Sequence, residues 1–237
     1  MQLLAPAKLT VSLRMTGLRD DGYHLIDAEM VSLDLADVLT LDLAVAPSIV
    51  SYTGAYPVDV EPGLDLVSQA LTHVRRSAAV VVDKRIPAGG GLGGGSSDAA
   101  AILRWAGEAD LAAAANLGAD VAFCLVGGRA RVQGIGEVVT SLAFEERTYT
   151  LLVPPFGCST PAVYAKWDEL GGPTGLNGND LEPAALNVEP RLRDWRDRLG
   201  DATGVTPKLA GSGATWFVEG DFPGGDRLVT TTIAPLG

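Results

Sequence analysis

Residues 87–101 of this chain are PAGGGLGGGSSDAAA, and six of the seven positions from Gly89 to Gly95 are glycine. Because glycine costs backbone entropy, such a run suggests that the backbone itself approaches a ligand closely. The residues after it predict a helix, capped by Ser96 or Ser97, with one apolar stripe. The stripe comprises Ala99, Ile102, Leu103 and Ala106. A glycine loop that opens a helix directs free N–H groups and the positive end of the helix dipole outward, which favours phosphate.

Three other interpretations of this loop fit less well. A Walker A loop requires a lysine where Ser96 stands. The spacing of Gly89, Gly91 and Gly94 fits a dinucleotide-binding fingerprint. However, residues 84–87 separate the loop from its preceding strand, and no acidic residue ends a second strand about 20 residues later. A flexible linker would have polar, low-complexity neighbours, whereas a Val-rich strand and an Ala-rich helix flank this loop.

The composition is that of a globular chain. Of its 237 residues, 47% are hydrophobic and 20% are charged, which suits one large or two modest domains with a sizeable core. The formal net charge of −11 argues against general binding to nucleic acid or anionic membranes, since both require basic surface. Because lysines are scarce, an anionic substrate would need help from one of them, from arginines, from backbone N–H groups or from Mg²⁺.

Cysteine and histidine usage excludes several kinds of site. Cys124 and Cys158 are too few and too far apart for a metal knuckle or a disulfide framework, so reduced thiols are expected. His24 and His73 do not form the H-E-x-x-H pattern of a zinc site. No run of about 18 apolar residues predicts a membrane span, and residues 1–6 lack the basic start of a signal peptide. We therefore expect a cytoplasmic protein.

The predicted elements follow the apolar periodicity and the Gly and Pro breakers. The first half is predicted to hold half-buried strands at 9–16 and 39–45, a turn at 19–22, a loop at 47–63, helices at 64–76 and 111–117, a buried strand at 79–82 and a hairpin at 130–139. The second half is predicted to hold strands at 149–153, 214–218 and 227–233, a helix at 161–170, loops at 171–179 and 211–213, and helical stretches around Leu181 and Leu192. We place a domain boundary after Arg147.

Several polar residues are ambiguous when considered alone. Lys8 stands at the entrance of the first strand, on the polar side with Thr10, where an ordinary surface lysine is the usual outcome. Asp120 is a lone carboxylate in apolar surroundings, and its local pattern favours a helix N-cap. Tyr23 and His24 follow a turn and are by themselves more typical of surface packing than of a binding site.

Eight separated segments resemble, in the same order, motifs of the GHMP small-molecule kinases. Those of the superfamily are Pro6–Leu9, Pro87–Ala100, Gly118–Val121 and Leu209–Thr215. Within it, the chain most resembles the kinases that act on 4-diphosphocytidyl-2-C-methyl-D-erythritol, through Asp21–His24, Lys84–Pro87, Ser159–Pro161 and Asn179–Pro183. The resemblance extends from about residue 5 to about residue 218.

The resemblance implies a two-domain α+β fold. The N-terminal ATP-binding domain, residues 1–147, would be like domain 2 of ribosomal protein S5, and the C-terminal domain, residues 148–237, would be ferredoxin-like. The tail after Val218 is short and lacks the helix usual in the family, so we expect a trimmed second domain. The implied reaction transfers the γ-phosphoryl group of ATP to the 2-hydroxyl of the cytidyl substrate, in the non-mevalonate route to isopentenyl diphosphate.

The resemblance also implies roles for Asp120 and Lys8. The Asp that matches Asp120 acts as base on the substrate hydroxyl, and the Lys that matches Lys8 lies beside it and beside the transferring phosphate. Phosphoryl transfer needs mostly positioning and charge neutralisation, with one carboxylate to accept the hydroxyl proton. A nearby ammonium keeps that carboxylate ionised and offsets the charge that develops at the phosphate. In this context we prefer the catalytic interpretation of both residues.

The implied ligands are ATP with Mg²⁺ and the cytidyl substrate. The ATP-binding residues would be Asp65, Leu66, Lys84, Pro87, Gly89, Gly90, Gly91, Leu92, Gly93, Gly94, Gly95, Ser96 and Ser97, with Ser97 also assigned to Mg²⁺ through ATP. The substrate-binding residues would be Thr10, Tyr23, His24, Thr160, Tyr164, Gly211 and Ser212. The rings of Tyr23 and Tyr164 would sandwich the cytosine, and His24 would hydrogen-bond to it.

Three positions depart from the family pattern. Thr10 stands where an Asn commonly holds the substrate near the base, and the shorter Thr would use its hydroxyl or a water. Asp65 replaces a frequent Asn near the adenine, which removes an N–H₂ donor and adds a negative charge. Tyr164 replaces the commoner Phe, which is a mild change.

Two alternative functions stay open on the sequence. One is a kinase for another small alcohol, such as homoserine or a mevalonate derivative, although neither has a base that Tyr23 and Tyr164 would stack on. The other is a non-catalytic nucleotide-binding relative, which the presence of Lys8 and Asp120 disfavours. We expect only small-molecule partners, no nucleic acid or membrane, and either a monomer or a homodimer.

Overall fold

The computed structural model describes the whole chain except residues 45–46, 59, 62 and 237. The strands are β1 (Gln2–Leu18), β2 (His24–Asp42), β3 (Ile49–Gly54), β4 (Ala79–Lys84), β5 (Arg129–Gly134), β6 (Val138–Ser141), β7 (Thr148–Leu152), β8 (Lys208–Leu209), β9 (Trp216–Glu219) and β10 (Leu228–Thr231). The helices are α1 (Leu66–His73), α2 (Gly94–Ala106), α3 (Leu111–Leu117), α4 (Val121–Val126), α5 (Thr160–Glu169), α6 (Glu182–Val188) and α7 (Leu192–Thr203).

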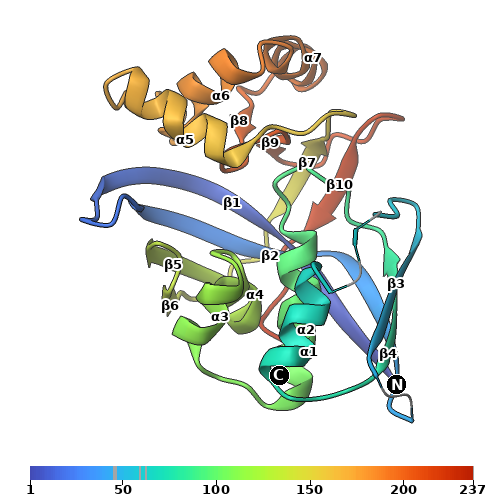
Figure 1. Ribbon diagram of the computed structural model, residues 1–237. Helices are drawn as coiled ribbons and strands as arrows, with labels where there is room; N and C mark the ends of the chain where they lie inside the picture. Colours follow the sequence, from blue (N-terminus) through green and yellow to red (C-terminus); the bar gives the residue numbers. More distant parts are fainter. Residues whose placement is uncertain (45–46, 59, 62, 237) are drawn as a thin grey trace.

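These strands form two sheets. The first has the order β3-β4-β2-β5-β6, with β1 paired to β2, and the second has the order β10-β7-β9-β8. Helices α1 to α4 gather on one side of the first sheet, while α5, α6 and α7 lie together beyond the second (Figure 1). The mixed α+β class predicted from the sequence is confirmed. The boundary after Arg147 and the trimmed second domain stay predictions.

The long antiparallel hairpin of β1 and β2 runs through the first sheet (Figure 1). Its register shifts between Pro6 and Lys8, and again between Thr10 and Ser12. These irregularities interrupt the alternation of inward and outward side chains. Residues 5–10 are all buried, because α2 packs against β1 and the apolar cluster shared with the second sheet covers Ala7 and Leu9. The prediction of a half-buried strand is therefore wrong at Leu9 and Thr10. Lys8 and Thr10 therefore lie inside the protein.

The prediction of a continuous loop over 47–63 is also wrong. Within it, Ile49–Gly54 forms β3, which pairs in parallel with β4. The β-branched residues of this segment favour a strand, but the surrounding Pro and Gly residues concealed it. The predictions that Val45 ends a strand and that Pro62 is one of the breakers in this loop lie outside the described residues.

Helix α2 begins within the glycine run and not at the serines. Gly93 is its N-cap residue, with a φ of 69° in the left-handed region, which glycine adopts without steric cost. Ser96 and Ser97 already lie inside the helix, so the predicted serine cap is wrong. No side chain caps this end, and its first N–H groups are left for another acceptor.

A cluster of buried apolar residues joins the two sheets. Leu9 and Leu33 enter it from the first sheet, and Leu151 and Phe217 enter it from the second. Leu92, the only residue with a side chain in the glycine run, belongs to the same cluster and is 1% exposed. The glycine run is therefore fixed at the contact between the sheets.

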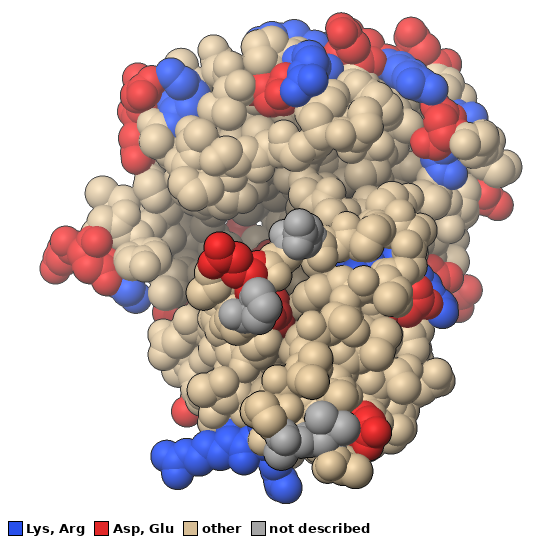
Figure 2. Space-filling view, turned by 45° about the vertical axis from the view of Figure 1, so that its right-hand side comes forward, with Lys and Arg blue, Asp and Glu red and all other residues tan. Residues whose placement is uncertain are grey.

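The charged side chains and the hollow on one face of the molecule are shown in Figure 2. On the face drawn in Figure 2, Lys and Arg are scattered among Asp and Glu instead of gathering in one basic area, and a hollow opens near its middle. Across the ranges that the structure describes, none of the helices has the length and apolar character needed to cross a membrane.

Candidate active site

Asp120 and Lys8, which are far apart in the sequence, meet in the structure. Asp120 occupies the N-cap position of α4, but its side chain makes no capping hydrogen bond. Its carboxylate instead lies 3.2 Å from Lys8 Nζ. Lys8 is 5% exposed, so the interpretation as a surface lysine is wrong, whereas the Asp120 side chain is 33% exposed. A buried ammonium thus faces a carboxylate that a ligand can reach.

The side chain of Lys8 is constrained both at its ammonium and along its aliphatic stem. Its Nζ donates a hydrogen bond to Thr10 Oγ1 at 3.1 Å. On the stem, a Cβ added to Gly93 would lie 2.6 Å from Lys8 Cγ, so only glycine allows the loop to approach this side chain. Thr10, where the family commonly has Asn, therefore contacts the lysine directly.

A cavity of about 510 Å³ opens around this pair. Its lining contains all seven residues assigned to the substrate from the sequence, namely Thr10, Tyr23, His24, Thr160, Tyr164, Gly211 and Ser212. Lys8 and Asp120 lie in the same lining, with Gly91 of the glycine run. The roles of these residues stay predictions, but the fold brings the residues together.

The aromatic part of this cavity lies between the β1–β2 hairpin and α5. The ring centroids of His24 and Tyr164 are 5.0 Å apart, and Tyr23 is 59% exposed. Burial and the nearby Asp120 carboxylate raise the pKa of Tyr164 to about 12, so its hydroxyl stays protonated. The sequence did not reveal Asp168, whose Oδ1 lies 2.8 Å from His24 Nε2. Its spacing of four residues from Tyr164 on a predicted helix was the available signal.

Asn179 holds the second glycine loop in place. Its amide nitrogen donates to the carbonyl oxygens of Leu209 at 2.8 Å and Gly211 at 2.6 Å. At the tip of the loop, the hydroxyls of Thr160 and Ser212 are 2.8 Å apart. Asn179 also forms an isolated parallel β-bridge with Leu13 of β1. The loop is thus aligned with the strand that carries Lys8.

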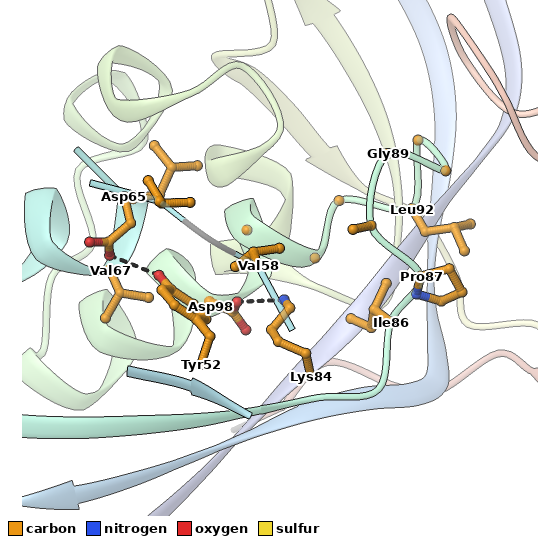
Figure 3. A pocket seen from close by; sticks show the side chains of 18 of the residues that line it. Tyr52, Val58, Asp65, Val67, Lys84, Ile86, Pro87, Gly89, Leu92 and Asp98 are labelled. Atoms are coloured by element: carbon orange, nitrogen blue, oxygen red, sulfur yellow. Dashed lines mark hydrogen bonds and ion pairs between the residues drawn. The ribbon is translucent and has the colours of Figure 1, made fainter. Parts of the chain in front are cut away.

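A second cavity of about 340 Å³ follows the glycine run (Figure 3). It contains every predicted ATP-binding residue except Ser96 and Ser97. The Ser97 hydroxyl donates to the carbonyl of Pro6, and the residue is almost fully buried. This geometry gives no support to a contact of Ser97 with phosphate or metal. Gly91 lines both cavities, so they meet at the glycine run.

Lys84, one of the predicted ATP-binding residues, belongs to a buried ionic cluster. Its Nζ pairs with Asp37 and lies 2.7 Å from Asp98 Oδ2 (Figure 3). Asp37 also accepts hydrogen bonds from the N–H groups of Arg85 and Ile86. Burial raises the pKa of Asp98 to about 7, against the charge of Lys84 and with the help of Asp37. The charge of Lys84 is therefore already balanced within the protein.

Asp65 lines the same cavity but its oxygens are occupied. It caps α1 by accepting from Ser68 N at 2.8 Å and Ser68 Oγ at 2.6 Å. The Tyr52 hydroxyl donates to it at 2.9 Å (Figure 3). Burial alone would raise the pKa of Asp65, but these hydrogen bonds outweigh it and lower the pKa. The negative charge that distinguishes Asp65 from Asn is thus used inside the fold.

Two glycines of the run are expected to respond in opposite ways to alanine. Gly91 has a φ of +77°, and a Cβ there would lie 2.6 Å from the carbonyl oxygen of Gly213. Gly91→Ala should therefore destabilise the protein by about 1–3 kcal/mol and lower activity. Gly95 lies in α2, where a Cβ would make an ordinary contact of 3.7 Å. Gly95→Ala should be neutral or stabilising by up to about 1 kcal/mol. Urea denaturation of both variants tests this, and equal losses would contradict it.

Comparisons with known proteins indicate the family of this chain. Residues 65–128 match the family described as GHMP kinases N terminal domain. The chain is 38% identical to the 4-diphosphocytidyl-2-C-methyl-D-erythritol kinase of Paracoccus denitrificans, over 90% of this chain and 84% of that protein. It is 37% identical to the protein of that name from Thiobacillus denitrificans, over 91% of this chain and 84% of that one.

Solved structures give the same result. A crystal structure of 4-(cytidine 5'-diphospho)-2C-methyl-D-erythritol kinase superposes with a TM-score of 0.77 and 28% identity, covering 98% of each chain. The homoserine kinase from Cytophaga hutchinsonii has a TM-score of 0.63 over 99% of this chain and 95% of that one, but at 17% identity it shares only the fold. The identities over most of the chain, with the matching fold and domain, show that this chain belongs to the 4-diphosphocytidyl-2-C-methyl-D-erythritol kinase family of the GHMP kinases.

Proposed function

We propose that this chain transfers the γ-phosphoryl group of ATP to the 2-hydroxyl of 4-diphosphocytidyl-2-C-methyl-D-erythritol. The observation that carries the proposal is the position of the Lys8–Asp120 pair, in a cavity that meets the glycine-lined cavity at Gly91. A glycine backbone suits a triphosphate, and an aromatic cavity suits a flat pyrimidine. The pair lies where an alcohol from one cavity would reach a phosphate from the other.

In the proposed reaction, Asp120 accepts the proton of the attacking hydroxyl. The hydroxyl oxygen forms a bond to the γ-phosphorus as the bond from that phosphorus to the β-phosphate oxygen breaks, and ADP leaves. Lys8 keeps Asp120 ionised and offsets the charge on the transferring group. Thr10 holds the Lys8 ammonium by accepting its hydrogen bond.

The nucleotide would be bound mainly through backbone groups. The uncapped first turn of α2 and the glycine run supply N–H donors. Because Asp37 and Asp98 already balance Lys84, that lysine adds little net positive charge. The negative charge of the triphosphate would therefore be neutralised mainly by the backbone N–H donors, by Lys8 and by a metal ion.

Mg²⁺ would arrive with the nucleotide. Within the parts of the chain that the structure describes, no three His, Cys, Asp or Glu residues are grouped to hold a metal ion. A magnesium ion carried on triphosphate oxygens needs few protein ligands, as Mg²⁺ prefers, and the Asp120 carboxylate in the cavity lining would offer it an oxygen. When bound, the ion would neutralise phosphate charge. Ser97 as its ligand stays a prediction.

An ADP-release assay over a panel of alcohols tests the proposed function. We expect turnover with the cytidyl substrate, strong preference for it over the uridine analogue, and no turnover with homoserine or mevalonate. Family membership disfavours those alternatives, as does the aromatic cavity. Equal rates with homoserine would reject the assignment, and ATP binding without turnover of any alcohol would indicate a non-catalytic relative.

The setting of the reaction follows from its substrates. Since it consumes ATP and a nucleotide-linked alcohol, we propose that it takes place in the cytoplasm with small molecules as its only partners. A monomer would suffice, because both cavities are lined by one chain. Sedimentation distinguishes a monomer from a homodimer.

A further inference from the structure

The imidazole of His24 is held by one face of α5. Tyr164 packs against it with tilted rings, and Trp167 meets it edge-on at a centroid distance of 5.8 Å. Asp168 Oδ1 lies 2.8 Å from Nε2. These three residues have the i, i+3, i+4 spacing that places side chains on one side of a helix. Only 12% of the His24 side chain is exposed, so α5 determines the orientation of the ring.

The carboxylate of Asp168 also determines which ring nitrogen carries hydrogen. An ionised carboxylate only accepts hydrogen bonds, so the neutral imidazole beside it donates from Nε2. Nδ1 then keeps its lone pair and is an acceptor. Among the hydrogen bonds of the described residues, none reaches Nδ1 of His24, and the residue lines the cavity that contains Lys8 and Asp120.

We propose that Asp168 is a positioning residue that makes this site select cytosine over uracil. By holding His24 in the Nε2–H form, it presents Nδ1 as an acceptor to the exocyclic amino group of cytosine. Uracil has a carbonyl oxygen at the same position, so two acceptors would face each other. This inference rests on the proposed function and adds the residue, Asp168, that determines which pyrimidine base the site accepts.

The position of Asp168 separates this role from direct binding. It is not part of the cavity lining, and half of its side chain is exposed. It therefore acts through His24, and its replacement is not expected to unfold the protein. Its neighbour Glu169 pairs with Lys166 instead, so it provides a matched control on the same helix turn.

The kinetic test compares kcat/KM for the cytidyl substrate and its uridyl analogue at about pH 8, where free imidazole is neutral. The wild type and Asp168→Glu should prefer cytidine by about 10- to 100-fold or more. Asp168→Ala should lose most of this preference. Asp168→Lys offers only donors to Nε2, which moves the ring hydrogen to Nδ1, and should favour uridine. Glu169→Gln should behave as the wild type. Equal losses for both substrates, with an unchanged ratio, would overturn the proposal.

A spectroscopic test reads the ring hydrogen directly. The chain has two histidines, so ¹⁵N-histidine spectra of the wild type and of His73→Gln assign His24. We expect the Nε2–H form in the wild type and the Nδ1–H form in Asp168→Lys. A doubly protonated His24, or the same form in both proteins, would overturn the proposal. If the wild type does not phosphorylate the cytidyl substrate, the proposed function fails, and calorimetric binding of CDP against UDP still decides the role of Asp168.

Discussion

Asp120→Asn is expected to lower kcat by about a thousandfold, within the usual range for loss of a catalytic base. The amide has almost the same shape as the carboxylate but does not accept the hydroxyl proton. ATP and the cytidyl substrate should bind with little change, since Asp120 is one residue of a large lining. Single-turnover kinetics with separate binding measurements would show whether the loss lies in the chemical step.

A second aspartate provides the control for this variant. Asp110 is the N-cap of α3, and its carboxylate accepts hydrogen bonds from Ala112 N and Ala113 N. Asp110→Asn is the same chemical change at a true cap, where Asn serves equally well, and it should leave both kcat and stability unchanged. Near-normal kcat in Asp120→Asn would show that Asp120 is no base and only marks the start of α4.

Asp37→Ala is expected to cost about 3–5 kcal/mol of the free energy of unfolding. Asp37 is fully buried and accepts from Lys84 and from the N–H groups of Arg85 and Ile86. Without it, one ammonium partner and two backbone donors are left unpaired in the interior. Since a domain is typically stable by only about 5–15 kcal/mol, chemical denaturation should detect this clearly.

The exposed pair at the same turn is the matched control. Asp83 and Arg85 form an ion pair in which both side chains are substantially exposed. Solvent-exposed pairs contribute at most about 1 kcal/mol, so Asp83→Ala should have little effect. If Asp37→Ala were as harmless as Asp83→Ala, the buried cluster would not be what secures the beginning of the glycine loop.

The sequence predicted those elements whose signals are local. Helix α3 was predicted with its observed bounds, because an Ala-rich segment stands between an aspartate cap and a glycine. Strand β3 was missed because breakers surround it. The burial of Lys8 was missed because it depends on the glycine run packing against this strand, a contact between segments far apart in the sequence.

The site residues also differ in how far the sequence alone could predict them. The glycine run indicated a phosphate site from composition alone, whereas the roles of Asp120 and Lys8 came from the family resemblance. Local pattern favoured a cap for Asp120, because α4 does begin there. Asp37 and Asp168 escaped notice because their partners, Lys84 and His24, belong to other elements. Such pairings become visible only when sheet order and helix packing are known.

The burial of Leu92 between the two sheets has a thermodynamic consequence. A ligand that orders the glycine run would also stabilise the packing of Leu92 between the two sheets. By linkage, whatever stabilises this packing would raise the affinity for the ligand by the same free energy. In the proposed nucleotide complex, binding at the glycine run and packing between the two sheets would therefore be coupled through Leu92, one of the ten buried residues of this cluster.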